Sequence, residues 1–172
     1  MPDRNTKIQF KAETMTNITI RRAVLTDAPQ LPHLFETSIR NIASHFYSPD
    51  QVDAWAARKE RIEAVFRDDF NARNAWVAEN DEEDILAYID LEGGGHIDFF
   101  YAHPDVSKTE TTRHMYELLE AEARDQGVPY LTTEASESAR RFFEKYGFAV
   151  TSRNDVILNG VGIHNYRMEK AL

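Results

Sequence analysis

Residues whose types could do chemistry are concentrated in the segment 96–113. A strand-like run over 97–102 contains Asp98 and leads, through a His-Pro-Asp tripeptide, into a polar stretch at the start of a helix. That stretch consists of Ser107, Lys108, Thr109, Glu110, Thr111, Thr112 and Arg113. Its hydroxyl groups can cap the helix or donate hydrogen bonds to an anion, and its Lys and Arg side chains can pair with phosphate. The segment is therefore a candidate anion site, and a solvated helix start with polar caps is the alternative interpretation.

Thiol and metal chemistry find no support in the sequence. The chain has no cysteine, which excludes disulfides, thiolate nucleophiles and thiolate metal ligands. The histidines near the strand-like segments have no spacing that specifies a metal site, so no metal is predicted. These histidines are His96, His103, His114 and His164.

Length and charge limit the classes of protein to consider. The 172 residues fit one domain, expected over 15–172 after a loosely ordered N-terminal extension over 1–14. The net charge of −9 disfavours nucleic-acid binding and mildly favours cationic small molecules. No apolar run is long enough for a membrane span or a signal-peptide core, so we expect no membrane association and a cytoplasmic protein.

Strand and helix patterns alternate along the chain. Strands are expected at 17–22, 75–78, 85–91, 97–102 and 130–134, followed by two strands around an Asn-Gly turn at 159–160. Helices are expected after a Thr-Asp cap at 26–27, after a Ser-Pro-Asp-Gln capping box at 48–51, around 61–70, from the polar loop to Gly127, and over 136–146. This order predicts an α/β layered domain with a mixed sheet.

Five segments in this order resemble the GNAT acetyltransferase superfamily. They are Ile20-Arg-Arg-Ala23 with Asp27-Ala28, Tyr47-Ser-Pro-Asp-Gln-Val-Asp-Ala-Trp55, the run 95–105, the run 134–148 ending in Tyr-Gly-Phe, and Asn165-Tyr-Arg-Met-Glu-Lys170. The resemblance implies a GNAT-like acyl-CoA N-acyltransferase fold, with a mixed central sheet of about seven strands flanked by helices. It also implies transfer of an acetyl group from acetyl-CoA to a primary amine of a small molecule or a peptide N-terminus.

The resemblance also implies where acetyl-CoA binds. The backbone of Phe100, Tyr101 and Ala102 would pair with the pantetheine arm, and the pyrophosphate would lie over residues 107–113. Free N–H groups and the positive end of the helix dipole suit an anion at such a position. Ser136 and Phe143 would complete the donor site from the late helix.

The loop departs from the family pattern, which has Gln or Arg, two variable residues, Gly, one variable residue, and Gly or Ala. Those positions fall on Ser107, Glu110 and Thr112, and none matches. Glycine permits backbone to approach phosphate closely, whereas a glutamate adds an unfavourable charge. Three hypotheses therefore stay open: a working N-acetyltransferase, a non-catalytic binding or regulatory module with the same fold, and an acyltransferase that uses another thioester donor.

Catalytic residues follow from the same resemblance. The family often uses a tyrosine to protonate the departing thiolate, and this position falls on Phe143, which has no proton to give. Tyr146 lies three residues later on the same helical face and is the candidate substitute. Asp98 is the candidate base for the acceptor amine, with Glu92 and Glu134 as alternatives. A structural hydrogen-bonding role for Asp98 and a packing role for Tyr146 are the competing interpretations.

The acceptor side is less defined. Trp55, Phe46 and Tyr47 could line an acceptor pocket or belong to the core, and the neighbouring Asp50 and Asp53 would suit a cationic acceptor or simply a solvated face. The sequence leaves the oligomeric state open, with a homodimer among the options.

Overall fold

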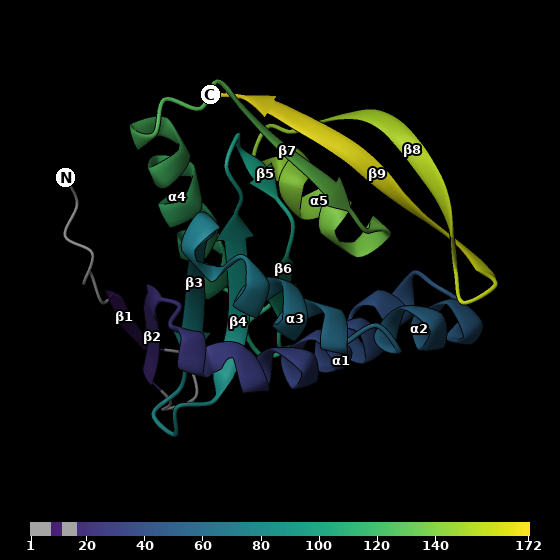
Figure 1. Cartoon of the computed structure of the whole chain (residues 1–172), viewed down its shortest axis with the longest axis horizontal. Helices are drawn as coiled ribbons and strands as arrows, with labels where there is room; N and C mark the ends of the chain where they lie inside the picture. The colour runs from purple at the N-terminus through teal and green to yellow at the C-terminus, as the bar shows by residue number, and fades with distance from the viewer. Residues whose placement is uncertain (1–7, 12–16) are drawn as a thin grey trace.

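The computed structural model describes residues 8–11 and 17–172, in which helices cover both faces of two β-sheets (Figure 1). The first sheet has the order β1 (Ile8–Lys11), β2 (Asn17–Arg22), β3 (Asn74–Glu79), β4 (Ile85–Leu91) and β6 (Phe100–Ala102), with every neighbour antiparallel. The second has the order β5 (His96–Ile97), β7 (Tyr130–Ala135), β9 (Val161–Ala171) and β8 (Ala149–Leu158). The predicted α/β fold is confirmed, but the strands form two sheets instead of one central sheet.

The N-terminal strand lies inside the stretch expected to be a loosely ordered extension. Ile8–Lys11 pairs antiparallel with β2, with Ile8 opposite Ile20. Residues 1–7 and 12–16, which contain Met15, lie outside the described residues. The expected division into an extension over 1–14 and a domain over 15–172 therefore stays a prediction.

The helices pack on opposite faces because strand side chains alternate. Ala75 and Val77 face the core under α1 (Leu31–Asn41), α2 (Pro49–Ala56) and α3 (Glu60–Asp68). Trp76 and Ala78 belong to the other core, which contains α4 (Glu110–Asp125) and α5 (Glu137–Lys145). Three short 3₁₀ helices connect these elements: η1 (Leu25–Gln30), η2 (Ala43–His45) and η3 (Phe70–Ala72). Among the described helices, none is both long enough and apolar enough to cross a membrane.

One predicted helix start is confirmed and another is wrong. Ser48 caps α2 with its Oγ accepting from the Gln51 backbone N–H at 3.3 Å, while the Ser48 N–H donates to the Gln51 side chain at 3.0 Å. Asp27 lies within η1 and does not cap α1, which begins at Leu31, four residues after Asp27. Its carboxylate instead accepts from the Val24 N–H and pairs with Arg21 at 2.8 Å, an ion pair that occupies its oxygens.

The C-terminal hairpin turns at the expected Asn-Gly pair, where Asn159 and Gly160 have positive φ angles of 49° and 80°. Its two strands extend over α2 (Figure 1). The Gln51 side chain donates to the Gly162 carbonyl at 2.8 Å, and the Tyr47 hydroxyl donates to the His164 carbonyl at 2.9 Å. These bonds attach the hairpin to the helical side of the molecule.

The strand expected over 97–102 is interrupted, and this interruption separates the two sheets. β5 pairs parallel with β7, whereas β6 pairs antiparallel with β4. Between them, the Phe99 N–H donates to the fully buried Asp90 carboxylate at 2.9 Å, and Arg73 pairs with the same carboxylate at 2.8 Å. Burial raises the pKa of Asp90 above its usual range, although Arg73 favours its ionised form. A buried ion pair therefore sets the point from which β6 and β7 diverge.

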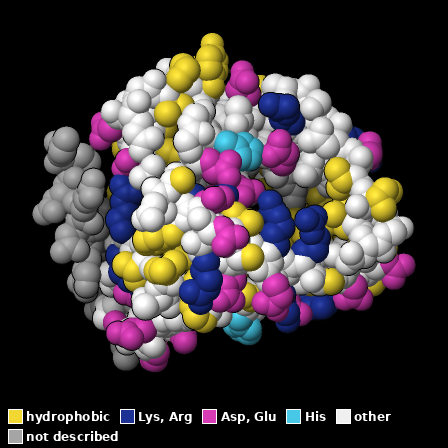
Figure 2. All heavy atoms as spheres, in the orientation of Figure 1, with side chains coloured by type: hydrophobic (Ala, Val, Ile, Leu, Met, Phe, Trp, Pro, Cys, Tyr) yellow, Lys and Arg dark blue, Asp and Glu magenta, His cyan; other side chains and the backbone are white. Residues whose placement is uncertain are grey.

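The face that carries α2 and α3 is hollowed near its middle, and side chains of both charges surround the hollow (Figure 2).

Candidate functional site: a cleft between β6 and α5

Three cavities adjoin one another along the divergence of the two sheets. We name them the outer cavity (about 450 Å³), the middle cavity (about 100 Å³) and the inner cavity (about 310 Å³). The outer and middle cavities share Ile42, Ser107, Thr112, Ser138 and Phe142. The middle and inner cavities share Trp55, Tyr101 and Ser136. The shared walls make the three cavities one continuous cleft.

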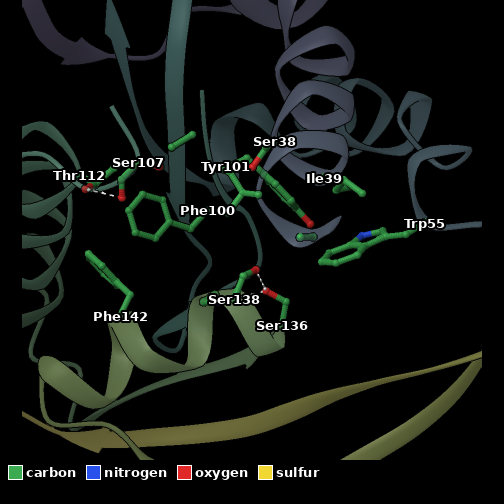
Figure 3. Close-up of a pocket in the computed structure, with 14 residues that line it drawn as sticks. Ser38, Ile39, Trp55, Phe100, Tyr101, Ser107, Thr112, Ser136, Ser138 and Phe142 are labelled. Atoms are coloured by element: carbon green, nitrogen blue, oxygen red, sulfur yellow. Dashed lines mark hydrogen bonds between the residues drawn. The ribbon is translucent and has the colours of Figure 1, made fainter. Parts of the chain in front are cut away.

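The middle cavity contains the strand expected to bind the donor. Phe100, Tyr101 and Ala102 all line it, as do Ser136 and Ser138 from the start of α5 (Figure 3). Phe100 makes an edge-to-face contact with Phe142, with ring centroids 5.1 Å apart. β6 and the first turn of α5 thus form the two walls of a narrow, mostly apolar passage.

The loop before α4 is built without the backbone conformations that require glycine. No residue between 106 and 112 has a positive φ angle. Hydrogen bonds instead fold the loop back on itself, from the Val106 N–H to the His103 carbonyl (3.0 Å) and from the Thr109 N–H to the Val106 carbonyl (3.3 Å). Thr109 caps α4 by accepting from the Thr111 N–H at 3.2 Å. The polar caps are therefore present, and the loop also lines a cavity, while the anion site stays a prediction.

The loop residues divide between cavity wall and core. Ser107 and Thr112 line both the outer and the middle cavities, whereas Thr111 is buried and lines none of the three. The remaining loop residues line the outer cavity: Lys108, Thr109, Glu110 and Arg113.

The outer cavity is basic in a chain of net charge −9. α5 contributes Arg141 and Lys145 to its wall, and the loop contributes Lys108; none of the three has a carboxylate partner among the described residues. Its one acidic residue, Glu110, pairs with Arg113. The two α5 cations were missed from the sequence, and their i, i+4 spacing beside the expected cleft was the signal that could have found them.

Tyr101, Trp55 and Ser136 form the constriction between the middle and inner cavities. The Tyr101 side chain extends toward the Trp55 indole (Figure 3). Burial raises the pKa of Tyr101 well above its usual range, so its hydroxyl stays protonated at neutral pH. Ser136 caps α5, accepting from the Ala139 N–H at 3.1 Å. The sequence marked Tyr101 only for its backbone and did not identify the hydroxyl.

Two carboxylates line the inner cavity. Asp98 lies 3.2 Å from the Arg73 guanidinium, and Glu134 lies 3.1 Å from the His96 ring. Glu92, a third candidate base from the sequence, also pairs with Arg73 and does not line the cavity. Within the described ranges, no group of three His, Asp or Glu side chains is placed to hold a metal ion.

Comparison with known proteins identifies the family. A family model described as an acetyltransferase (GNAT) domain matches residues 44–170. The chain belongs to the GNAT acetyltransferase family. It is 28% identical over 155 residues to the uncharacterized N-acetyltransferase YafP of Escherichia coli (strain K12), an alignment that covers 90% of this chain and 96% of YafP.

Solved GNAT structures agree with the fold. A GCN5-related N-acetyltransferase from Rhodopseudomonas palustris is 31% identical, with a TM-score of 0.79 over 89% of this chain and 94% of that one. The PaiA N-acetyltransferase of Thermoplasma acidophilum, solved in complex with coenzyme A, is 16% identical, with a TM-score of 0.68 over 90% of this chain and 99% of that one. The second likeness is one of fold alone.

Two late-helix residues lie elsewhere than the GNAT resemblance implies. Phe143 is 1% exposed and packs against Phe148, with centroids 5.0 Å apart, so it lies in the core and lines none of the three cavities. Tyr146 lines the outer cavity, where its ring packs against Tyr116 (4.6 Å) and Phe142 (4.7 Å). Neither side chain lies at the constriction, because the helical face that contains them turns toward α4.

The residues considered for the acceptor side of this GNAT protein do not all line the same cavity. Trp55 and Tyr47 line the inner cavity, whereas Phe46 lines the outer one. Asp50 and Asp53 line none of these three, and Asp53 pairs with Arg40 at 2.7 Å.

Proposed function

We propose that this protein transfers an acetyl group from acetyl-CoA to the amine of a small acceptor, with the donor in the outer and middle cavities and the acceptor in the inner cavity. The observation that carries the proposal is a continuous cleft with a basic outer end in an otherwise acidic protein. The family supplies the reaction class, and the cleft supplies a position for each reactant. No membrane partner or nucleic acid is needed, and a cytoplasmic protein fits this chemistry.

Two kinds of contact would hold the donor: charged side chains for its phosphates and the backbone edge of β6 for its pantetheine arm. Lys108, Arg141 and Lys145 lie where the anionic end of acetyl-CoA would enter, and unpaired cations bind phosphate as point charges or forks. The pantetheine arm follows β6, where the backbone groups next to the middle cavity can pair with its amides. The acetyl thioester then reaches the constriction at Tyr101.

The reaction is direct attack at the thioester carbon. The neutral amine forms the new C–N bond, the C–S bond breaks, and the Asp98 carboxylate takes the proton that the ammonium group gives up, directly or through water. The Tyr101 hydroxyl donates a hydrogen bond to the oxygen or sulfur on which negative charge develops. Coenzyme A leaves as the thiol after it takes up one proton.

Release of free thiol from acetyl-CoA tests this function. We expect release to depend on an added small amine, and Asp98→Asn to lower kcat by on the order of 10²-fold without changing the Kd for acetyl-CoA. Thr151→Ala, a substitution on the exposed part of β8, serves as the matched control. Release that is the same with and without every amine tested would contradict the proposal.

A further inference from the structure

The wall of the inner cavity combines aromatic and aliphatic residues with charged groups of both signs. Its aromatic residues are Phe35, Tyr47, Trp55, Phe99 and Tyr101, and the C-terminal hairpin closes it with Leu158 and Ile163. Its cations, Arg58 and Arg61, come from the α2–α3 connection and the start of α3. A volume of about 310 Å³ is at the lower end for ligand pockets and fits a small molecule.

Arg58 and Arg61 are exceptional among the arginines of this protein. Most described arginines pair with a carboxylate; those that do not are Arg58, Arg61, Arg141 and Arg167. Two of these four line the inner cavity, and both are solvent-accessible. The guanidinium of Arg61 lies 5.2 Å from the centre of the Phe99 ring. None of the described carboxylates pairs with its N–H donors.

Negative charge is in excess around Arg73, a second arginine near the Phe99 ring. Arg73, 5.8 Å from the same ring, is the single cation among four carboxylates: Asp69, Asp90, Glu92 and Asp98. Of these four, only Asp98 lines the inner cavity. The inner cavity therefore has the carboxylates Asp98 and Glu134 in its wall together with the cations Arg58 and Arg61. Glu134 is paired with the His96 ring, whereas Asp98 lies beside Arg73 among an excess of carboxylates.

We infer that the acceptor is a small zwitterion, an amine that also carries a carboxylate or a phosphate-type anion. Its ammonium group lies at Asp98, and its anionic group is bound by Arg58 and Arg61. This inference rests on the proposed acetyl transfer and adds the substrate class. It replaces the expectation of a purely cationic acceptor, because Asp50 and Asp53 lie outside the inner cavity while two unpaired arginines lie within it.

The order of groups along the wall agrees with this orientation. Trp55 forms part of the constriction, Arg58 follows three residues later, and Arg61 three residues after that. Residues three apart on helical turns lie on one side, so the arginines continue the wall away from the constriction. An acceptor held by both ends thus places its amine next to the thioester and its anion farther along the wall.

Equilibrium binding of reaction products tests the inference without relying on turnover. The probes are N-acetylphenylalanine and N-acetylleucine, their carboxamides, and N-acetyl-2-aminoethylphosphonate, each titrated in the presence of saturating coenzyme A. We expect the carboxylates or the phosphonate to bind at least about tenfold more tightly than the carboxamides, as a charge-assisted hydrogen bond would provide. The ratio between the carboxylates and the phosphonate tells which anion is preferred.

One double variant and one control variant locate the effect. Arg58→Gln and Arg61→Gln together are expected to abolish the preference for the anion while leaving the Kd for coenzyme A unchanged. Arg167→Gln, an unpaired arginine outside the three cavities, is expected to leave both unchanged. Equal affinity for acid and amide, or a preference that survives the double substitution, would overturn the inference.

The outcome is separable from that of the proposed function. Absence of coenzyme A binding contradicts the donor site and the function together. Coenzyme A binding with preferential acetylation of amines that have no anionic group, such as phenethylamine over phenylalanine, contradicts only the zwitterionic acceptor. Preferential acetylation of the amino acid, lost in the double variant through a raised KM, supports it.

Discussion

Tyr101 connects the donor and acceptor parts of the cleft through one hydroxyl group. It lines both the middle and the inner cavities and extends toward Trp55, whereas Tyr146 lines only the outer cavity. We expect Tyr101→Phe to lower kcat by on the order of 10²-fold, with an unchanged Kd for acetyl-CoA. Tyr146→Phe is expected to leave kcat within about twofold, since its hydroxyl lies away from the constriction. Steady-state kinetics of both variants would contradict this assignment if Tyr146→Phe showed the larger loss.

Glu110 is the one acidic residue in the wall of the outer cavity, and its pairing with Arg113 offsets its charge. Glu110→Gln should tighten acetyl-CoA binding by roughly threefold to tenfold, because it removes a repulsive charge and one of the two carboxylates that pair with Arg113. The matched control is Glu117→Gln, which also removes a partner of Arg113 (3.1 Å) but lies outside the cavity. Calorimetric titration measures both, and weaker binding by Glu110→Gln would count against a phosphate at this position.

Pairing between distant side chains was beyond the reach of the sequence. The arginines without a carboxylate partner could not all be identified from the sequence, because several partners come from distant segments, as Glu122 does for Arg22 and Asp90 does for Arg73. The hydroxyl of Tyr101 was hidden for the same reason. The identity of Asp98 and Ser136 as cleft residues, in contrast, followed from the resemblance alone, and both line the cleft.

At the scale of elements, local sequence patterns predicted the helix start and the turn that depend only on neighbouring residues. The Ser48 capping box, the Asn159-Gly160 turn and the alternating strands are all present where expected. The interruption between β5 and β6 was not predicted, because it depends on Asp90 and Arg73 from two other segments. The short turns of the loop have no positive φ angle, so this backbone path does not require glycine.

Gly95 fixes how β5 approaches β7. It has a φ angle of +93°, and an added Cβ would lie 2.2 Å from the Tyr130 carbonyl oxygen and 2.4 Å from Val128. Gly95→Ala should lower the free energy of unfolding by roughly 2–6 kcal/mol, the sum of backbone strain and overpacking. Gly93→Ala, where nothing lies within 4 Å, is expected to change it by less than about 1 kcal/mol. Urea unfolding of the two variants would contradict this account if their stabilities were equal.

Glu120 joins α4 to β9 through Lys170, 2.5 Å away. Burial disfavours its ionised form, but hydrogen bonds from Lys170, Tyr116 and Arg124 dominate and lower its pKa to about 2. Because the folded-state pKa lies below the unfolded value, this group stabilises the protein above about pH 4.5, and the contribution is lost as pH falls toward 2. The Tm of Glu120→Gln should therefore fall less than the Tm of the unchanged protein as the pH is lowered over that range. Thermal denaturation measured as a function of pH tests this prediction, and an equal decrease in Tm for both proteins would contradict it.

At the scale of the whole molecule, the positive side chains of the cleft contrast with the negative net charge of the chain. The chain has a net charge of −9, yet most of the described arginines and lysines without a carboxylate partner line the outer and inner cavities, with Arg167 outside them. A non-catalytic module would have no need of a cleft with a basic entrance and a protonated phenol at its centre. The acidic remainder of the surface keeps anions from binding elsewhere, so anionic reactants concentrate at the cleft.

The central claim is that this cleft binds acetyl-CoA without the family's glycine-rich loop. Isothermal titration calorimetry with acetyl-CoA tests it most directly, on the unchanged protein, on an Arg141→Gln/Lys145→Gln double variant and on Arg167→Gln as the control. We predict saturable binding of micromolar strength with one site per chain, weakened by roughly tenfold or more in the double variant and unchanged in the control. Absence of saturable binding at millimolar acetyl-CoA, or binding that the double substitution leaves unaltered, would contradict the claim.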